Sequence, residues 1–267
     1  MHLTHTNADA DSFASAYWGY RTIGGGIYVD NPDSTVLNLM KKLNVQNFFP
    51  EQVHCFYVYD TCEPQKVPFD VYNYRVFDHH ASYCSEFLSK ADFAHVRQRT
   101  ANVMNLYDLS KEMQLDEKIL FAFAVALVTD TGFLKTARSE EIEYLAKFLG
   151  NHILEEVFDV ILFGKIEDTK RFVDILSKIQ IIEQRFKIGL VKCESDDEFL
   201  CIVDLLMFPL GLSIIIGRLP WGIWIYCRKN LVQKIYQQLL RNFSNREAGK
   251  LFDFYDVDLI IDLLKTL

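Results

Sequence analysis

Four places in the first half of the chain end a hydrophobic segment with carboxylate or imidazole side chains. They are His5-x-x-x-Asp9-x-Asp11, Asp60, Asp78-His79-His80 and Asp130. Carboxylates and imidazoles without a thiolate are the donors that Mn²⁺ and Mg²⁺ prefer, and they argue against a structural zinc site. So many acids in one place would repel one another unless cations were bound. The residue types therefore predict a metal site.

The number of carboxylates favours two divalent ions rather than one. Two metal ions about 3.5–4 Å apart can polarise a phosphate group and activate water, so they form a site for phosphoryl transfer. Each motif taken singly has a simpler interpretation. Asp9 or Asp11 could cap a helix, Asp60 could begin a turn, and Asp130 could end a helix. Their order and their common placement after hydrophobic segments favour the joint interpretation.

The elements that carry these motifs alternate between strand and helix. Short segments rich in aromatic and β-branched residues predict strands at 1–4, 27–30, 54–60 and 74–80. Helical patterns follow at 11–23, 33–44, 100–113 and 116–133. This alternation predicts an α/β fold, with a mostly parallel sheet covered by helices on both faces. The carboxyl ends of parallel strands share one edge, so the motifs should converge there.

The chain is predicted to form two domains. A catalytic domain is expected over residues 1–140 and a smaller α/β domain over 187–267, joined by a helical connector over 141–186. The connector lacks the proline, serine and glycine enrichment of a disordered linker. The triplet Gly24–Gly26 follows a predicted helix, and no GK[ST] comes after it, so it is interpreted as a helix stop rather than a phosphate loop.

The composition of the 267 residues limits the partners. The net charge of −8 gives no general attraction for nucleic acid, so long DNA or RNA is not an expected substrate. The longest hydrophobic run is interrupted by Asp204 and Pro209, which disfavours a membrane span. The six cysteines form no CxxC pair and read as free thiols in a reducing compartment. With no signal-like segment recognised, a cytoplasmic enzyme is expected, with a homodimer as one option.

In this order the four motifs resemble those of the DHH phosphoesterases. That family carries His-x-Asn-Pro-Asp-x-Asp, a strand ending in Asp, Asp-His-His, and Asp-Thr-Gly. In this sequence the first motif reads HTNADAD, with Ala8 in place of proline, and the other three motifs are intact. The replacement removes a fixed φ angle but no ligand. The resemblance covers about residues 1–140.

The resemblance implies a role for each motif residue. His5 and Asp9 would bind one metal, Asp60 would bridge both, and the second would be bound by Asp11, His79 and Asp130. The expected ion is Mn²⁺, with Mg²⁺ and Co²⁺ as alternatives. Catalytic roles fall on Asp60, on His80 beside the substrate phosphate, and on Asp78, which would orient a histidine. The remaining histidines match no motif and are interpreted as structural or surface residues; they are His2, His54, His95 and His152.

The second half departs from the family branch that includes the nanoRNases and the 3′-phosphoadenosine 5′-phosphate phosphatases. That branch has a strand-end arginine and a Gly-Gly-Gly-His loop ending in Ala-Ala-Gly. Here Arg228 matches the arginine and Ala248-Gly249 match the loop end, while Arg241, Asn242 and Phe243 replace the glycines. The expected substrate-binding residues are His80, Arg228, Lys229, Arg246 and Gly249. Surface charge is the simpler interpretation of the three basic residues.

The leading hypothesis is a metal-dependent phosphodiesterase or phosphatase. Its substrates would be short nucleotides: RNA dinucleotides and other very short oligonucleotides, linear or cyclic dinucleotides, or 3′-phosphorylated nucleotides, held in a cleft between the domains. One alternative keeps the chemistry and acts on inorganic pyrophosphate or polyphosphate. Another is a catalytically silent nucleotide-binding sensor, which the altered glycine loop favours and the complete ligand set disfavours.

Overall fold

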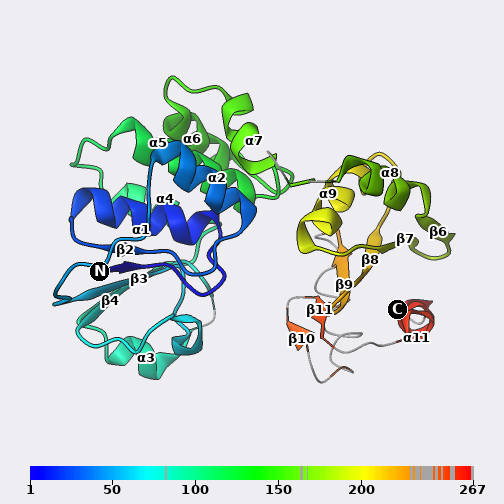
Figure 1. Ribbon diagram of the computed structural model, residues 1–267, viewed down its shortest axis with the longest axis horizontal. Coiled ribbons are helices and arrows are strands. Elements are labelled where there is room, and N and C mark those ends of the chain that lie inside the picture. The colour runs from blue at the N-terminus through cyan, green and yellow to red at the C-terminus, as the bar shows by residue number, and fades with distance from the viewer. Residues whose placement is uncertain are drawn as a thin grey trace. The chain divides into compact units, whose positions relative to one another are not determined.

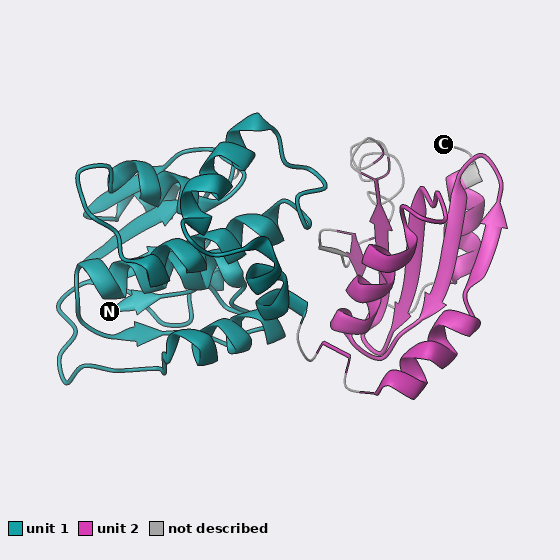
Figure 2. Cartoon of the chain, turned by 90° about the horizontal axis from the view of Figure 1, so that it is seen from above, with its two compact units in different colours: residues 1–163 teal, residues 164–267 magenta. Residues whose placement is uncertain are grey.

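The chain folds into two compact units, residues 1–163 and 164–267 (Figure 2). The computed structural model describes residues 1–81, 83–162, 165–166, 168–228, 231, 235, 243, 246–247, 249–252 and 256–265. Each unit has its own sheet and its own hydrophobic cores. The two units are therefore described separately.

The first unit contains the predicted parallel sheet. Its strands are β1 (His2–Leu3), β2 (Ile27–Tyr28), β3 (Phe56–Tyr59), β4 (Tyr74–Asp78) and β5 (Phe93–Val96). They lie in the order β2-β1-β3-β4-β5, and every pairing is parallel. The predicted α/β class is confirmed. The edge strand β5 was not predicted, because its FAHV segment has no buried face and so no alternation of polar and apolar residues.

Helices cover both faces of this sheet (Figure 1). One face packs with the other helices of the unit in the larger core, and α3 (Ser85–Ser89) packs on the opposite face. The helices of the larger core are α1 (Ala10–Thr22), α2 (Ser34–Leu43), α4 (Asn102–Leu109), α5 (Glu117–Asp130), α6 (Ser139–Leu149) and α7 (Leu154–Leu162). The central α5 is buried almost all round, as its continuous apolar run dictates.

The strand order places a topological switch point between β1 and β3. From β1 the chain passes to β2 on one side, whereas β3, β4 and β5 follow on the other side. Helices that follow strands on the two sides of such a point diverge, which opens a crevice at the carboxyl ends of the strands. The loops after β1 and β3 carry the first two motifs, so the topology brings these motifs together.

The second unit is a mixed sheet with helices on both faces. Its strands are β6 (Gln180–Glu183), β7 (Lys187–Lys192), β8 (Ile214–Leu219), β9 (Gly222–Cys227), β10 (Arg246–Glu247) and β11 (Lys250–Leu251). They lie in the order β10-β11-β9-β8-β7-β6, with β7 and β8 parallel. Helices α8 (Thr169–Ser177) and α9 (Asp196–Leu206) share a core on one face, and α11 (Val257–Lys265) packs on the other.

The range 141–186, expected as a helical connector, includes residues of both compact units. Helices α6 and α7 bury Tyr144, Leu145, Phe148, Val157, Val160 and Ile161 in the core of the first unit. Helix α8 instead buries Phe172 and Ile175 in the second unit, and β6 pairs with β7. The apolar faces of these helices therefore assign them to the units on either side. In the part of the chain described here, no helix has the length and apolarity needed to cross a bilayer.

The Ala8 departure from the family pattern forms a backbone contact that proline could not form. The Ala8 N–H donates a hydrogen bond to the Asp30 carbonyl oxygen at 2.9 Å, and the Asp33 N–H donates to the Ala8 carbonyl at 3.1 Å. Ala8 is fully buried. These two bonds tie the first motif to the loop between β2 and α2, and the first one needs the N–H that proline lacks.

We therefore expect Ala8→Pro to lower the free energy of unfolding by about 1–3 kcal/mol, because it leaves the Asp30 carbonyl without its donor. Urea unfolding followed by circular dichroism would measure the change. The matched control is Ala10→Pro, at the first position of α1, where a helix has no use for the N–H and proline is tolerated. Equal stability of Ala8→Pro and the parent chain would contradict this account of the departure.

Candidate metal centre

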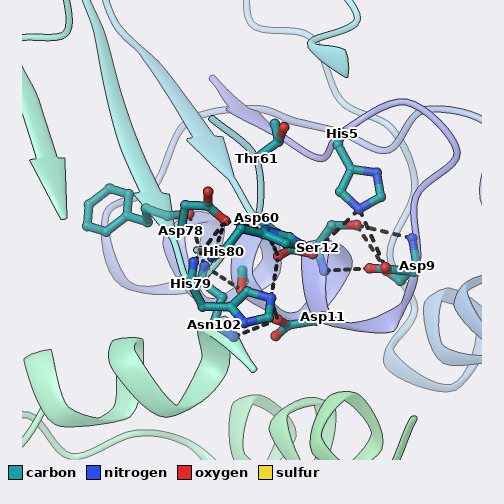
Figure 3. Close-up of polar contacts among 12 residues, drawn as sticks. His5, Asp9, Asp11, Ser12, Asp60, Thr61, Asp78, His79, His80 and Asn102 are labelled. Atoms are coloured by element: carbon teal, nitrogen blue, oxygen red, sulfur yellow. Dashed lines mark hydrogen bonds and ion pairs between the residues drawn. The ribbon is translucent and has the colours of Figure 1, made fainter. Parts of the chain in front are cut away.

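The carboxyl ends of β1, β3 and β4 bring the motif side chains to one place (Figure 3). His5 lies two residues beyond β1, Asp60 directly follows β3, and Asp78 is the last residue of β4. Asp60 has a positive φ of 60°. Non-glycine residues seldom adopt this left-handed conformation, and such residues gather at functional sites. The turn at Asp60 therefore directs one carboxylate into the centre of the cluster.

The Asp60 carboxylate lies between two imidazole rings. Its Oδ2 atom is 3.5 Å from Nε2 of His5, and its Oδ1 atom is 3.0 Å from Nε2 of His79. Asp60 itself is buried. Each carboxylate oxygen thus faces a different histidine, which is the arrangement expected of a ligand that bridges two ions.

The hydrogen bonds of the two Nδ1 atoms determine which ring nitrogen of each histidine carries the hydrogen. Nδ1 of His5 is 2.9 Å from the Thr6 carbonyl oxygen, and Nδ1 of His79 is 2.9 Å from the Arg99 carbonyl oxygen. A carbonyl only accepts hydrogen bonds, so Nδ1 must be the donor in both rings. In the neutral rings Nε2 then presents a lone pair to Asp60. Backbone-anchored histidines of this kind are typical metal ligands.

An unpartnered oxygen supports the same interpretation. Oδ1 of Asp60 is buried and has no hydrogen-bond partner among the described residues. Two acceptors facing each other, Asp60 Oδ1 and His79 Nε2, require a cation or a proton between them. The donor set of carboxylate and imidazole therefore fits a divalent metal ion.

In the chain without metal, protons on the two histidines take the place of such a cation. Burial lowers the pKa of His5, but its contacts with Asp60 and Asp9 outweigh burial and raise the pKa to about 11. In the same way, Asp60 and Asp11 overcome the burial of His79 and raise its pKa to about 10. The protons on Nε2 then occupy the positions at which the Nε2 lone pairs of the neutral rings would bind a metal ion.

Asp9 and Asp11 are held by backbone amides at helix starts. Oδ1 of Asp9 accepts a hydrogen bond from the Ser12 N–H at 3.0 Å and caps α1, while its Oδ2 lies 3.5 Å from Nε2 of His5. Asp11 accepts from the Asn102 and Val103 N–H groups at 2.6 and 3.1 Å, at the start of α4. Its Oδ2 lies 3.6 Å from Nε2 of His79. The helix caps thus fix both carboxylates in the cluster.

Asp130 completes the second group at the end of α5. The ligand atoms of Asp11, His79 and Asp130 lie within 4.8 Å of one another, as do those of His5, Asp9 and Asp60. Burial, and then the neighbouring carboxylates, raise the pKa of Asp11 to about 7 and that of Asp130 well above its usual value. The carboxyl end of a helix also disfavours a negative charge. Both carboxylates therefore need cations nearby to stay ionised at neutral pH.

Asp78 and His80 form a pair that adjoins these groups, because Nδ1 of His80 is also 3.7 Å from Oδ1 of Asp60. Nδ1 of His80 lies 2.8 Å from Oδ1 of Asp78, which also accepts the His79 N–H at 2.8 Å. Asp78 is fully buried, whereas half of the His80 side chain is exposed. The hydrogen bond to Asp78, opposed by burial, raises the pKa of His80. Asp78 thus orients His80 and leaves Nε2 of that ring for a further partner.

All six predicted ligands therefore lie in two groups that meet at Asp60, although metal binding itself stays a prediction. Sequence reasoning missed the backbone partners, above all the Arg99 carbonyl. The Arg99 guanidinium is held by Asp108 at 2.8 Å and donates to the Tyr144 hydroxyl at 2.8 Å, which fixes the loop that carries this carbonyl. Backbone carbonyls leave no mark on the sequence, so no sequence signal could have found this partner.

Three of the predicted substrate-binding residues of the second unit, Arg228, Arg246 and Gly249, are among the described residues. The Arg228 guanidinium donates to the backbone carbonyls of Leu212 and Met207, at 2.8 and 3.3 Å, and lies over the Phe208 ring. These contacts fix the segment after α9, so part of the hydrogen-bonding capacity of the Arg228 guanidinium is already used. Gly249 turns the β10–β11 hairpin with a φ of 85°. Arg246 lies in β10, and Lys229 lies outside the described residues.

Solved structures share this architecture. An exopolyphosphatase-related protein from Bacteroides fragilis superposes with a TM-score of 0.69, over 99% of this chain and 90% of that one, at 10% sequence identity. A putative family II inorganic pyrophosphatase from Methanococcus jannaschii gives a TM-score of 0.54, over 89% and 90% of the two chains, at 14% identity. The chain has their fold. No protein-family model and no curated sequence relative matches it.

The shared carboxylate leads to a first test of the centre. We expect Mn²⁺ to bind the purified chain at about two ions per molecule and to raise its melting temperature, because each ion offsets carboxylate repulsion. Asp60→Ala should weaken Mn²⁺ binding by at least about 100-fold, since even residues that only hydrogen-bond to a metal ligand typically change metal affinity by 10–100-fold. Calorimetry and thermal denaturation would measure both. The exposed Asp70→Ala is the control; unchanged Mn²⁺ affinity in Asp60→Ala would exclude a shared ligand.

Proposed function

We propose that this chain is a metal-dependent phosphoesterase of the DHH family that hydrolyses short nucleotide substrates. The observation that carries the proposal is the Asp60 carboxylate, whose two oxygens each face the Nε2 atom of a different, backbone-anchored histidine. Four ordered motifs and the fold shared with an exopolyphosphatase-related protein support it. When bound there, two divalent ions would activate water for attack at phosphorus and neutralise charge on the phosphate oxygens.

Each side chain has a definite part in this proposal. His5, Asp9 and Asp60 would hold one ion, and Asp60, Asp11, His79 and Asp130 the other. His80 would donate a hydrogen bond from Nε2 to a phosphate oxygen, because Asp78 already holds its Nδ1. Asp78 acts as a positioning residue, since it contacts His80 and the backbone N–H of His79. No side chain in this scheme forms a covalent bond to phosphorus.

Short substrates suit the charge of the chain. With a net charge of −8, it provides no broad positive surface for a long polyanion. RNA dinucleotides, linear or cyclic dinucleotides and 3′-phosphorylated nucleotides place few phosphates near the centre, where bound metal ions would offset the carboxylates. Mn²⁺ is the proposed ion, and Mg²⁺ or Co²⁺ would be compatible with the same oxygen and nitrogen donors.

A phosphoanhydride substrate is the competing proposal, and it is motivated by the names of the two proteins with a similar fold. One is an exopolyphosphatase-related protein and the other a putative inorganic pyrophosphatase. Both reactions need the same two-ion centre, so they differ in what holds the rest of the substrate. A sensor that binds nucleotides without turnover is the alternative outside enzymes.

A panel of substrates separates these proposals. With Mn²⁺ present, we expect hydrolysis of an RNA dinucleotide, 3′-phosphoadenosine 5′-phosphate or cyclic-di-AMP, followed by chromatography, and no turnover in Asp60→Ala. Preferred release of phosphate from pyrophosphate or polyphosphate would overturn the nucleotide assignment. Tight nucleotide binding without hydrolysis of any compound would favour the sensor. The Asp70→Ala variant should retain full activity, because this exposed residue lies outside the centre.

His80→Gln should separate catalysis from metal binding. Loss of the Nε2 donor should lower kcat by about 10²–10⁴-fold, the usual contribution of a positioned imidazole, with less than a twofold change in bound Mn²⁺. Steady-state kinetics and metal analysis of the same samples would measure this. His95→Gln, in the edge strand β5 and outside the motifs, is the matched control. A parallel loss of metal in His80→Gln would instead assign His80 as a ligand.

A further inference from the structure

A cavity of about 620 Å³ lies within the second unit, apart from the residues discussed so far. Its walls come from α8, from the ends of β7 and β8, and from the start of α11. Figure 1 shows these elements within the second unit. Arg228 adjoins Ser213, just before β8 begins, whereas Arg218 is near the end of β8. The cavity is therefore at the opposite end of this strand from the arginine predicted to bind substrate.

Two basic residues face each other in register at the cavity. Lys192 of β7 is the direct partner of Arg218 in the parallel neighbour β8, and both side chains are exposed. Neither forms an ion pair with any residue that the structure describes. Like charges opposite each other on neighbouring strands are destabilising. An anion bound between the two side chains would therefore stabilise the pair.

The other charged groups of the cavity are already balanced, with one exception. Arg171 pairs with Glu198 at 2.8 Å and Glu194 at 3.5 Å, and Lys178 pairs with Asp174 at 2.6 Å. Asp258, in the first turn of α11, has no ion-pair partner among the described residues. Among the described residues, the cavity lining thus has two cations and one carboxylate without an ion-pair partner.

The remaining lining is apolar or neutral. Leu190 and Ile216 pair with each other in the same register, two residues before Lys192 and Arg218, and so lie on the same face of the sheet. Gln180 adds a neutral amide from β6. A volume near 620 Å³ lies within the usual range for small-molecule sites.

We propose that this cavity binds a phosphate monoester of a polyhydroxy compound. The phosphate would lie between Lys192 and Arg218, because a monoester carries close to two negative charges at neutral pH and matches these two positive charges. Arginine also binds phosphate through two parallel hydrogen bonds. Asp258 would accept hydrogen bonds from hydroxyl groups and would repel a second phosphate, and Leu190 and Ile216 would contact the carbon skeleton. The assignment is independent of the metal centre.

Calorimetric titration of the full chain with adenosine 5′-monophosphate tests the proposal. To exclude binding at the metal centre, the titration is repeated in the Asp60→Ala background without added metal. We expect saturable binding that weakens by about tenfold in Lys192→Ala and in Arg218→Ala, each of which removes one charged contact. Lys187→Ala is the control, because Lys187 lies at the other end of β7 and pairs with Glu183. Glucose 6-phosphate, inorganic phosphate and adenosine complete the panel.

Each outcome decides part of the proposal. Stronger binding of adenosine monophosphate or of glucose 6-phosphate would identify a nucleotide or a sugar phosphate as the source of the monoester. Inorganic phosphate binding as tightly as both would overturn the role of Asp258 and the apolar residues. Equal binding of adenosine and its monophosphate, no binding at all, or unchanged affinity in both variants would overturn the site. In ligand-free protein, Lys192→Ala should also melt at an equal or higher temperature, since it removes the like-charge pair.

Discussion

The placement of one carboxylate between two imidazole rings is the constraint that the first unit must satisfy. Asp60 can face His5 and His79 only if the loops after β1, β3 and β4 meet, and these strands are neighbours in the order β1-β3-β4. The left-handed backbone conformation at Asp60 also directs the carboxylate toward the two rings. Removal of the carboxylate would leave two fixed rings with no common partner. The sheet order, the turn and the ring anchors are thus parts of one arrangement.

Close packing around Tyr59 fixes the position of the neighbouring Asp60. Tyr59, the residue before Asp60, hydrogen-bonds through its hydroxyl to Nδ1 of His2 at 2.9 Å, and Nε2 of His2 contacts the Gly24 carbonyl at 2.9 Å. A Cβ atom at Gly19 of α1 would lie 2.0 Å from the Tyr59 hydroxyl. The helix can therefore approach the sheet only because residue 19 is glycine. Burial lowers the pKa of His2 to about 4, so this ring stays neutral and serves packing.

The sequence predicted the site better than it predicted its supports. The alternation of strands and helices placed His5, Asp60 and His79 at strand ends, because period and turn residues are local properties. The anchors on Nδ1 are backbone carbonyls of Thr6 and Arg99, and any residue type supplies a carbonyl. The packing of the segment after residue 140 is hard to predict for a similar reason. Helix α6 belongs to the core of the first unit because its apolar face packs there, and the surface on which a helix packs cannot be inferred from its local sequence.

The second unit shows why a shared fold does not fix where an anion binds. At 10% sequence identity the chain still superposes over 99% of its length on the Bacteroides fragilis protein, so the fold does not require most side chains to be the same. Arg228 holds the segment after α9, whereas Lys192 and Arg218 are free of ion pairs among the described residues at the opposite end of β8. An anion site in this unit would therefore depend on where unbalanced charges lie on the sheet, rather than on the sheet itself.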